Sequence, residues 1–138
     1  ASKRVPKMEW EAQKIGIEAG DKMTLEQALN YLMVYSANDA AVMIAEGVGE
    51  DYDDFIRMMN EEAARLGATN THFVNPNGLH DDDHYTTAYD LFLIFRECVQ
   101  SPKFRELLDQ GYSSRQDQSP GRQDRHYGPG RELSDHPV

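Results

Sequence analysis

A serine and an asparagine stand two positions apart in Tyr35-Ser36-Ala37-Asn38-Asp39, and both side chains can act on a bound substrate. A serine hydroxyl can relay a proton, and an asparagine amide can hold a substrate carbonyl. Both residue types are also common caps at helix ends. The pair alone therefore favours capping over catalysis, and a catalytic interpretation needs support from the rest of the chain.

The residues around the pair predict two helices joined by a tight turn. Thr24 and Gln27 form a capping-box pattern, and apolar residues recur at helical spacing over 25–33. Residues 39–47 are apolar on every side between acidic ends, so this second helix must be buried all round. We expect Asp39 to cap the buried helix, which leaves Ser36 and Asn38 at the turn.

The chain beyond this turn predicts further helices and one long loop. Three aspartates favour the start of a third helix, which ends at Gly67. Residues 68–86 form a polar connection, in which Asn75-Pro76-Asn77-Gly78 is a strong turn signal. A fourth helix begins at about Thr87 and is apolar enough to predict deep burial, and a short fifth helix ends at Leu108. The pattern as a whole predicts a mainly α fold.

The composition divides the chain into a folded part, 1–111, and a tail, 112–138. Apolar runs alternate with charge in the folded part, whereas Leu133 and Val138 are the only aliphatic residues of the tail. Such a segment cannot offset the entropy of ordering its backbone, so we expect disorder there. The net charge is −10, and all the excess acid lies in the folded part. Nucleic-acid binding depends on clustered Lys and Arg, so we expect no nucleic-acid partner.

Cys98 is the only cysteine, which excludes an internal disulfide bond. Its place in an apolar helical pattern predicts a buried, inert thiol. No run approaches the ~20 apolar residues that span a membrane, and the first residues show no targeting signal. The sequence leaves membrane anchoring and oligomeric state open.

Two acidic segments raise metal binding as an alternative. His80 and His84 are four residues apart, but sharing an ion at that spacing requires a helix, and the aspartates between them predict a loop. Residues 51–62 have the acids of a calcium loop but lack its glycine and carry apolar side chains at ligand positions. We therefore expect no metal and no cofactor.

Residues 32–41, Leu-Met-Val-Tyr-Ser-Ala-Asn-Asp-Ala-Ala, resemble the second active-site motif of the D-alanyl-D-alanine carboxypeptidases, which are penicillin-binding serine peptidases. The resemblance extends over roughly residues 8–110. It implies that this chain is the helical portion of the α/β fold shared by β-lactamases and DD-peptidases, the penicillin-binding transpeptidase-like fold. Three further stretches match in the same order: Thr24-Leu25 with Leu29, Ala64 with Leu66-Gly67 running into Thr71 to Leu79, and His84 to Asp90.

The resemblance implies acyl-transfer chemistry in the bacterial cell envelope, outside the cytoplasmic membrane. The family removes the terminal D-alanine from peptidoglycan stem peptides through an acyl-enzyme, and β-lactams are trapped as stable acyl-enzymes. Its three motifs are S-x-x-K, S-x-N and K-T-G or K-S-G. Carried over by position, Ser36 would relay a proton to the leaving group and Asn38 would orient the substrate amide. Tyr35, next to the pair, is a candidate for lining the cleft.

Two of the three motifs are absent from this sequence. No serine is followed by a lysine three places on, and no lysine is followed by Thr-Gly or Ser-Gly. The chain therefore holds no nucleophile of this kind, and we expect it to be inactive alone, because loss of a nucleophile or its base costs orders of magnitude in rate. If the apolar helices normally pack on a sheet outside this chain, the chain should expose apolar surface and self-associate.

Two other functions remain as alternatives. A degenerate homologue without catalytic activity could use the cleft as a binding module, which the absence of two motifs favours for this chain. A serine β-lactamase is a weaker alternative, because its motif more often reads Ser-Asp-Asn and its loop carries a catalytic Glu, where this chain has Asn75-Pro76-Asn77-Gly78-Leu79.

Overall fold

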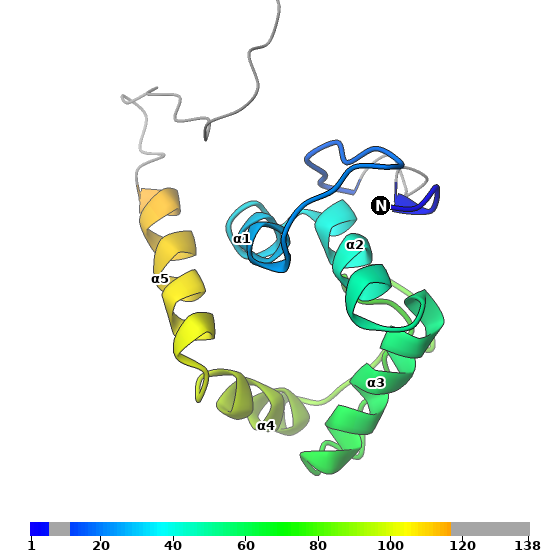
Figure 1. Cartoon of the computed structure of the whole chain (residues 1–138). Coiled ribbons are helices and arrows are strands. Elements are labelled where there is room, and N and C mark those ends of the chain that lie inside the picture. The colour runs from blue at the N-terminus through cyan, green and yellow to red at the C-terminus, as the bar shows by residue number, and fades with distance from the viewer. Residues whose placement is uncertain (6–11, 117–138) are drawn as a thin grey trace, which may run out of the picture.

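The computed structural model describes residues 1–5 and 12–116, and these residues form five α-helices joined by loops (Figure 1). Extended pairing within them is limited to an isolated antiparallel bridge between His72 and Tyr85. The mainly α prediction is confirmed. The helices are α1 (Leu25–Tyr35), α2 (Asn38–Val48), α3 (Tyr52–Arg65), α4 (Ala88–Cys98) and α5 (Pro102–Gln116).

The first two helices begin and end where the sequence predicts. The Gln27 backbone N–H donates to Thr24 Oγ1 at 3.2 Å, and the Thr24 N–H donates to Gln27 Oε1 at 2.9 Å, which completes the capping box. α1 ends at Tyr35, and α2 follows after two residues. Most of α2 is buried, namely Asp39, Ala40, Ala41, Val42, Ile44 and Ala45, as its apolar pattern predicts.

The third helix also follows the sequence signals. Asp51 is its N-cap and accepts a hydrogen bond from the Asp54 backbone N–H at 2.8 Å. After Arg65 the chain leaves the helix through Gly67, which has a φ of 82°, a value that glycine adopts without steric cost. The predicted start and end of this helix are therefore confirmed.

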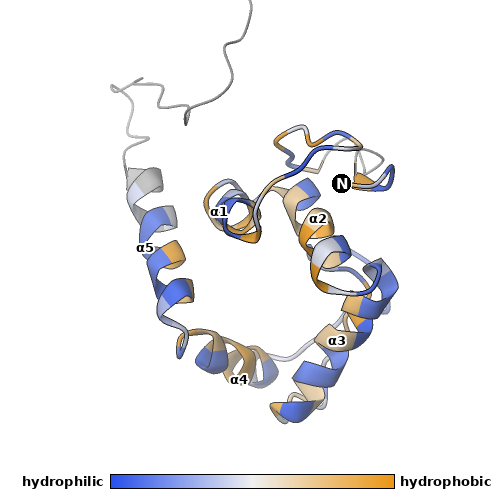
Figure 2. Cartoon of the chain, viewed as in Figure 1, coloured by the Kyte–Doolittle hydropathy of each residue, from blue (hydrophilic) through white to orange (hydrophobic). Residues whose placement is uncertain are grey.

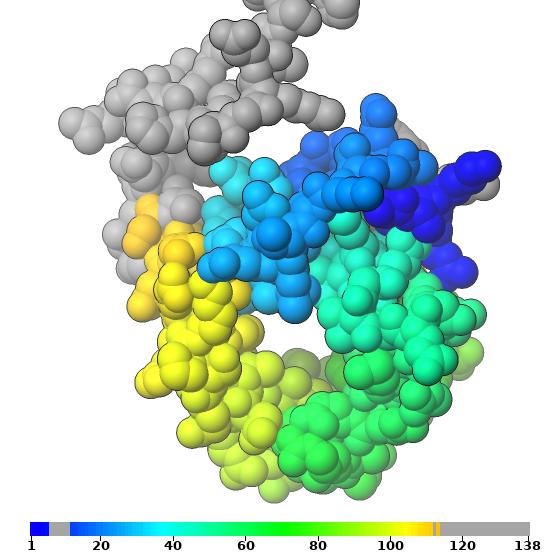
Figure 3. Space-filling view, viewed as in Figure 1, coloured from blue at the N-terminus to red at the C-terminus, as the bar shows by residue number. Residues whose placement is uncertain are grey.

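The helices follow one another around an open ring (Figure 1). α1 packs against both α2 and α5, and α2 packs against α3. Figure 3 shows an opening through the middle of the ring in the space-filling view. The main buried cluster lies to one side, where Val5 and Ile17 pack against Ala37, Ala40 and Val42. This cluster fixes the start of α2, which carries the candidate site.

The fourth helix is less buried than predicted. Only Asp90 and Leu93 of α4 are buried. Four of its large apolar side chains are half exposed or more, and Figure 2 shows apolar residues along most of this helix. The apolar pattern predicts that other elements pack on this helix, but no other described helix packs extensively on it. The prediction of deep burial is wrong for this chain, and the exposed side chains are Tyr89, Leu91, Phe92 and Phe95.

The fifth helix is longer than predicted. It does not end at Leu108 but continues to Gln116, so the boundary predicted at residue 111 lies inside it. Gly111 is buried and lies against Met33 of α1. A Cβ added there would stand 3.3 Å from the Met33 carbonyl oxygen, so the glycine permits close packing of the two helices. The tail predicted to be disordered lies, from residue 117 on, outside the described residues.

Candidate active site

The turn between α1 and α2 places Ser36 in an unusual backbone conformation. Ser36 has φ 53° and ψ 40°, in the left-handed region, and is the only non-glycine residue with a positive φ in the described part of the chain. Its N–H closes α1 by donating to the Tyr31 carbonyl oxygen. The left-handed conformation costs a non-glycine residue about 1–2 kcal/mol. Such strain is often found at functional sites, where the surrounding structure holds it in place.

The Ser36 side chain is exposed and uncommitted. Its hydroxyl makes no hydrogen bond with any residue for which the structure gives a position. The turn is instead held by backbone groups, because the Ala37 N–H also donates to the Tyr31 carbonyl oxygen, at 3.3 Å. The hydroxyl is therefore free to exchange a proton with a bound molecule.

The Asn38 side chain, by contrast, is held from two sides. Both its backbone N–H and its Nδ2 donate to the carbonyl oxygen of Gln13, at 2.9 and 3.0 Å. Its Oδ1 accepts from Nδ2 of Asn77 at 3.0 Å. The remaining contact, from Nδ2 to the Ser36 carbonyl oxygen, is 3.5 Å long and thus weak. One N–H of the Asn38 amide can therefore still donate to a ligand.

Asp39 fastens the N-terminal segment to α2. Its carboxylate is 1% exposed and accepts from the backbone N–H groups of Ile15, Gly16 and Ile17 at 2.9–3.2 Å. The N-cap of α2 is Ala37, which makes no side-chain capping bond, and Asp39 bonds within its helix only to the Ala40 N–H. The predicted capping role is therefore wrong in its main point. Asp39 chiefly holds the segment that carries Gln13.

The loop after α3 brings Asn77 to the pair. Asn75 Oδ1 accepts from the N–H groups of Asn77 and Gly78, at 3.3 and 2.7 Å, and its Nδ2 donates to the Leu79 carbonyl oxygen at 2.8 Å. Gly78 has a φ of 77°. The turn predicted at 75–78 is thus present, and it directs the Asn77 side chain toward Asn38.

The rest of this loop is anchored to α3 and α4. Asp90, which is 1% exposed, accepts from the Asn70 N–H and the Thr71 hydroxyl, both at 2.8 Å. Asn60 of α3 bonds to both backbone groups of Phe73, each at 2.8 Å. The long loop is therefore a fixed part of the fold and can position Asn77.

The histidines of the loop have partners within it. His84 Nδ1 accepts from the Val74 N–H at 3.1 Å, and His72 Nδ1 lies 2.6 Å from the Asp83 carbonyl oxygen. Among the described residues, no group of three His, Cys, Asp or Glu side chains is arranged to hold a metal ion. The His80 ring instead lies 3.4 Å from the Asp82 carboxylate.

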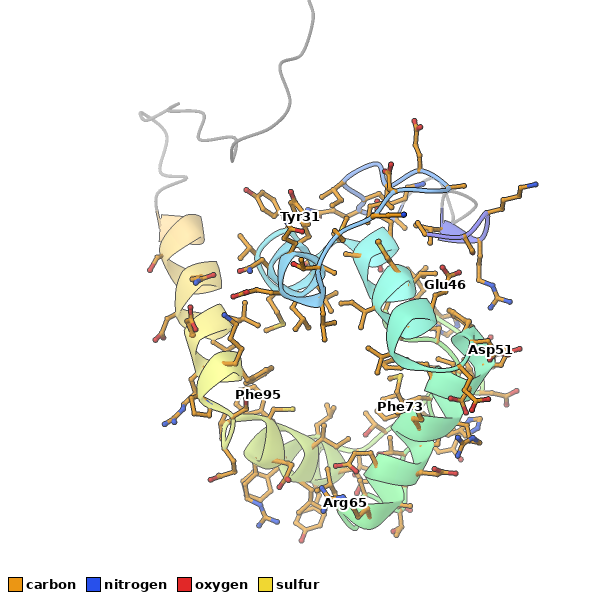
Figure 4. The ribbon with its side chains drawn as sticks, viewed as in Figure 1. Tyr31, Glu46, Asp51, Arg65, Phe73 and Phe95 are labelled. Carbon is orange, nitrogen blue, oxygen red and sulfur yellow. The ribbon has the colours of Figure 1, made fainter. Side chains whose placement is uncertain are left out.

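Tyr35 is directed away from the pair. Its ring lies 6.0 Å from that of Tyr31, and both line an open groove of about 480 Å³ between α1 and α5. Figure 4 shows Tyr31 on the side of α1 that faces away from the opening of the ring. Neither Ser36 nor Asn38 is among the described residues that line this groove. A role of Tyr35 in substrate binding stays a prediction.

Sequence reasoning missed Gln13 and Asn77 as parts of the site. Gln13 contributes through its backbone carbonyl oxygen, and its side chain donates to the Tyr35 carbonyl oxygen at 2.6 Å. No pattern in the sequence marks such a role. The sequence indicates Asn77 only as a turn residue, and that turn motif is the available signal.

Residues 2–116 match the D-alanyl-D-alanine carboxypeptidase family, and the chain belongs to that family. It is 37% identical over 87 residues to the D-alanyl-D-alanine carboxypeptidase DacF of Bacillus subtilis, covering 63% of this chain and 22% of the relative. The crystal structure of DacD from Francisella tularensis superposes with a TM-score of 0.72 and 32% identity over 78% of this chain and 26% of that one. The crystal structure of penicillin binding protein 6B from Escherichia coli superposes with a TM-score of 0.67 and 28% identity, over 71% of this chain and 31% of that one.

These similarities confirm the predicted family and fold class. The chain spans between 22% and 31% of the length of these three proteins. Among its described helices, none is both long enough and apolar enough to cross a lipid bilayer.

Proposed function

We propose that this chain supplies the second motif of a serine D-alanyl-D-alanine carboxypeptidase that trims peptidoglycan stem peptides in the bacterial cell envelope, outside the cytoplasmic membrane. Family membership over residues 2–116 supports this function. The observation that carries it is the strained turn, where the uncommitted hydroxyl of Ser36 stands two residues from the held amide of Asn38. Capping alone would not require a hydroxyl at Ser36, since its side chain caps neither helix.

The two side chains suit different parts of the reaction. The Ser36 hydroxyl can pass a proton toward the leaving amine, because it can both donate and accept. The Asn38 amide keeps one N–H available, which can donate to the carbonyl oxygen of the bound peptide. The nucleophile and its base must come from polypeptide beyond this sequence, because none of its serines has a lysine three places on.

We propose accordingly that the 138-residue chain does not form an acyl-enzyme by itself. Incubation with a fluorescent penicillin, followed by denaturing electrophoresis, should leave the chain unlabelled. A covalent adduct that survives denaturation would show that a nucleophile is present and would contradict this proposal.

The catalytic proposal can be tested in a chimaera. Residues 12–116 replace the matching segment of the Francisella tularensis carboxypeptidase, so that the rest of that protein completes the domain. We expect Ser36→Ala to lower D-alanine release by about 10²–10⁴-fold, the usual range for loss of a proton-transfer group. Asn38→Ala should lower acylation by about 10²-fold, as for loss of an oriented amide donor.

Matched controls separate catalysis from folding. Ser101→Ala removes a hydroxyl that accepts from the Phe104 N–H, and Gln100→Ala removes an amide that donates to the Arg96 carbonyl oxygen, so both remove a side-chain hydrogen bond outside the turn and the loop. Each should leave D-alanine release within about twofold of the parent chimaera at temperatures well below unfolding. Equal activities for Ser36→Ala and Ser101→Ala would overturn the proposed role of Ser36.

A non-catalytic binding module is the second candidate, and the absence of two motifs from the sequence favours it. A chimaera that binds penicillin reversibly but never acylates would support this alternative. A β-lactamase is less favoured, because the loop directs the neutral amide of Asn77, rather than a carboxylate, toward Asn38.

A further inference from the structure

Two segments far apart in the sequence meet at the Asn38 amide. Gln13, which lies 25 residues before Asn38, accepts from Nδ2, and Asn77, which lies 39 residues after it, donates to Oδ1. Both partners are on segments that are themselves fixed, the first by the buried Asp39 carboxylate and the second by the Asn75 turn. The Asn38 amide is therefore held by hydrogen bonds to two anchored segments.

The chemistry of these partners determines which way the Asn38 amide points. A backbone carbonyl oxygen can only accept, so the Gln13 carbonyl requires Nδ2 on its side. Oδ1 then faces Asn77 and can only accept, so Asn77 must present its own Nδ2. A flip of the Asn38 amide would place two oxygens against each other at Gln13.

We infer that Asn77 is a positioning residue, which holds the Asn38 amide in the orientation that leaves its second N–H free for a substrate carbonyl. This inference rests on the proposed function for its catalytic consequence, although the orientation itself does not depend on it. Asn77 acts through Asn38, and the long loop after α3 thereby becomes part of the site.

The inference makes a specific prediction about the type of group at position 77. Asn77→Ala removes the donor and leaves Asn38 Oδ1 without this partner. Asn77→Asp keeps the shape but sets a carboxylate, which can only accept, against Oδ1, and the Gln13 carbonyl blocks the flip that would relieve the repulsion. The nearly isosteric substitution should therefore be the more damaging one.

The orientation can be tested in the chain itself by nuclear magnetic resonance. In a nitrogen-labelled chain, the side-chain NH2 signals of Asn38 are identified by their loss in Asn38→Asp. We expect Asn77→Asp to shift these signals and speed their exchange with solvent more than Asn77→Ala does. Ser101→Ala, which removes a side-chain bond at the start of α5 outside this loop, should leave them in place. Unmoved Asn38 signals in a folded Asn77→Asp chain would overturn the inference.

The catalytic consequence is tested by a double-mutant cycle in the chimaera. We expect Asn77→Ala to lower acylation by penicillin about fivefold and Asn77→Asp by about fiftyfold, as for loss of one hydrogen bond and for an opposed charged group. In the Asn38→Ala background both effects should vanish, because the group that Asn77 positions is gone. Ser101→Ala should have the same small effect in either background.

The two arms distinguish the inference from the function on which it rests. Undiminished Asn77 effects in the Asn38→Ala background would show that Asn77 acts by another route and would overturn the inference. If the Asn38 signals move in the chain while Asn38→Ala itself leaves acylation unchanged, the positioning is supported and the proposed role of Asn38 fails.

Discussion

α2 and α4 are both eleven-residue helices rich in apolar residues, yet α2 is much more buried than α4. α2 lies between α1, α3 and the N-terminal segment, and most of its residues are buried. α4 buries only Asp90 and Leu93. Leu91, Phe92 and Phe95 are each 50–55% exposed.

The difference shows that an apolar pattern in the sequence indicates that a helix tends to be buried, but does not identify the residues that pack against it. α2 is buried by other segments of the chain. α4 is instead anchored mainly by hydrogen bonds between Asp90 and the adjoining loop. The candidate catalytic pair stands at the start of the well-covered helix. A catalytic group must be held in place by its surroundings, and α2 meets that requirement.

The buried carboxylates offer the strongest test of this contrast. Asp39→Ala leaves three backbone N–H groups without their acceptor, and we expect it to lower the free energy of unfolding by about 3–5 kcal/mol. Asp90→Ala removes the acceptor of one N–H and one hydroxyl and should cost about 2 kcal/mol. Urea denaturation followed by circular dichroism gives both values. Exposed Asp53→Ala is the control, and a larger loss at Asp90 than at Asp39 would reverse the comparison.

A matched pair of aliphatic truncations compares the helices directly. Ile44 of α2 is buried, and Ile44→Ala should cost about 2–4 kcal/mol. Leu91 of α4 is half exposed, so Leu91→Ala should cost less than about 1 kcal/mol. The same denaturation experiment measures both. Equal losses would mean that α4 is covered in solution, for example by a second copy of the chain.

Association of the chain tests the exposed surface of α4. The side chains of Tyr89 and Phe92 lie 6.3 Å apart between ring centres and are both more than half exposed. Apolar surface of this kind promotes association. We expect sedimentation equilibrium to show an average mass that rises with concentration, and Phe92→Ser to reduce that rise. A monomer at all concentrations, without dye-binding apolar surface, would contradict the expectation.

Local signals explain why much of the fold could be predicted. The Thr24 capping box, the Asp51 cap and the turn at 75–78 each depend on residues within four positions of one another. Their geometry can therefore be predicted from short stretches of sequence. The turn that carries Ser36 was predicted for the same reason.

The errors concern contacts between distant segments. The burial of α4 depends on what packs against it, and Gly111 permits an approach to Met33 that no local pattern reveals. The hold on Asn38 by Gln13 and Asn77 likewise joins three separate segments. A single sequence shows residue types and spacing but not which distant groups meet, so the partners of the pair could not be predicted.

A small but informative effect is expected at the strained turn beside α2. Ser36→Gly replaces a left-handed serine with a residue that tolerates this conformation, and we expect the free energy of unfolding to rise by about 1 kcal/mol. The same change removes the hydroxyl, so the chimaera should lose D-alanine release as Ser36→Ala does. Thermal denaturation of the chain measures the gain in stability. A destabilised Ser36→Gly chain would mean that the serine side chain, and not function, explains its presence at the turn.

The smallest expected effect concerns Cys98, which reports on the cover of α4 without any mutation. Partial burial raises the pKa of the Cys98 thiol above its ordinary value, and the neighbouring Glu97 carboxylate adds to the rise. Because only the thiolate reacts, a raised pKa means less thiolate at a given pH and slower alkylation. At about pH 8 we expect iodoacetamide to modify the folded chain several-fold more slowly than the same chain unfolded in urea. Since Cys98 is the only cysteine, mass spectrometry follows the reaction without ambiguity. Equal rates in both states would show that Cys98 is fully exposed to solvent in the folded chain. The partial burial of α4 would then be contradicted.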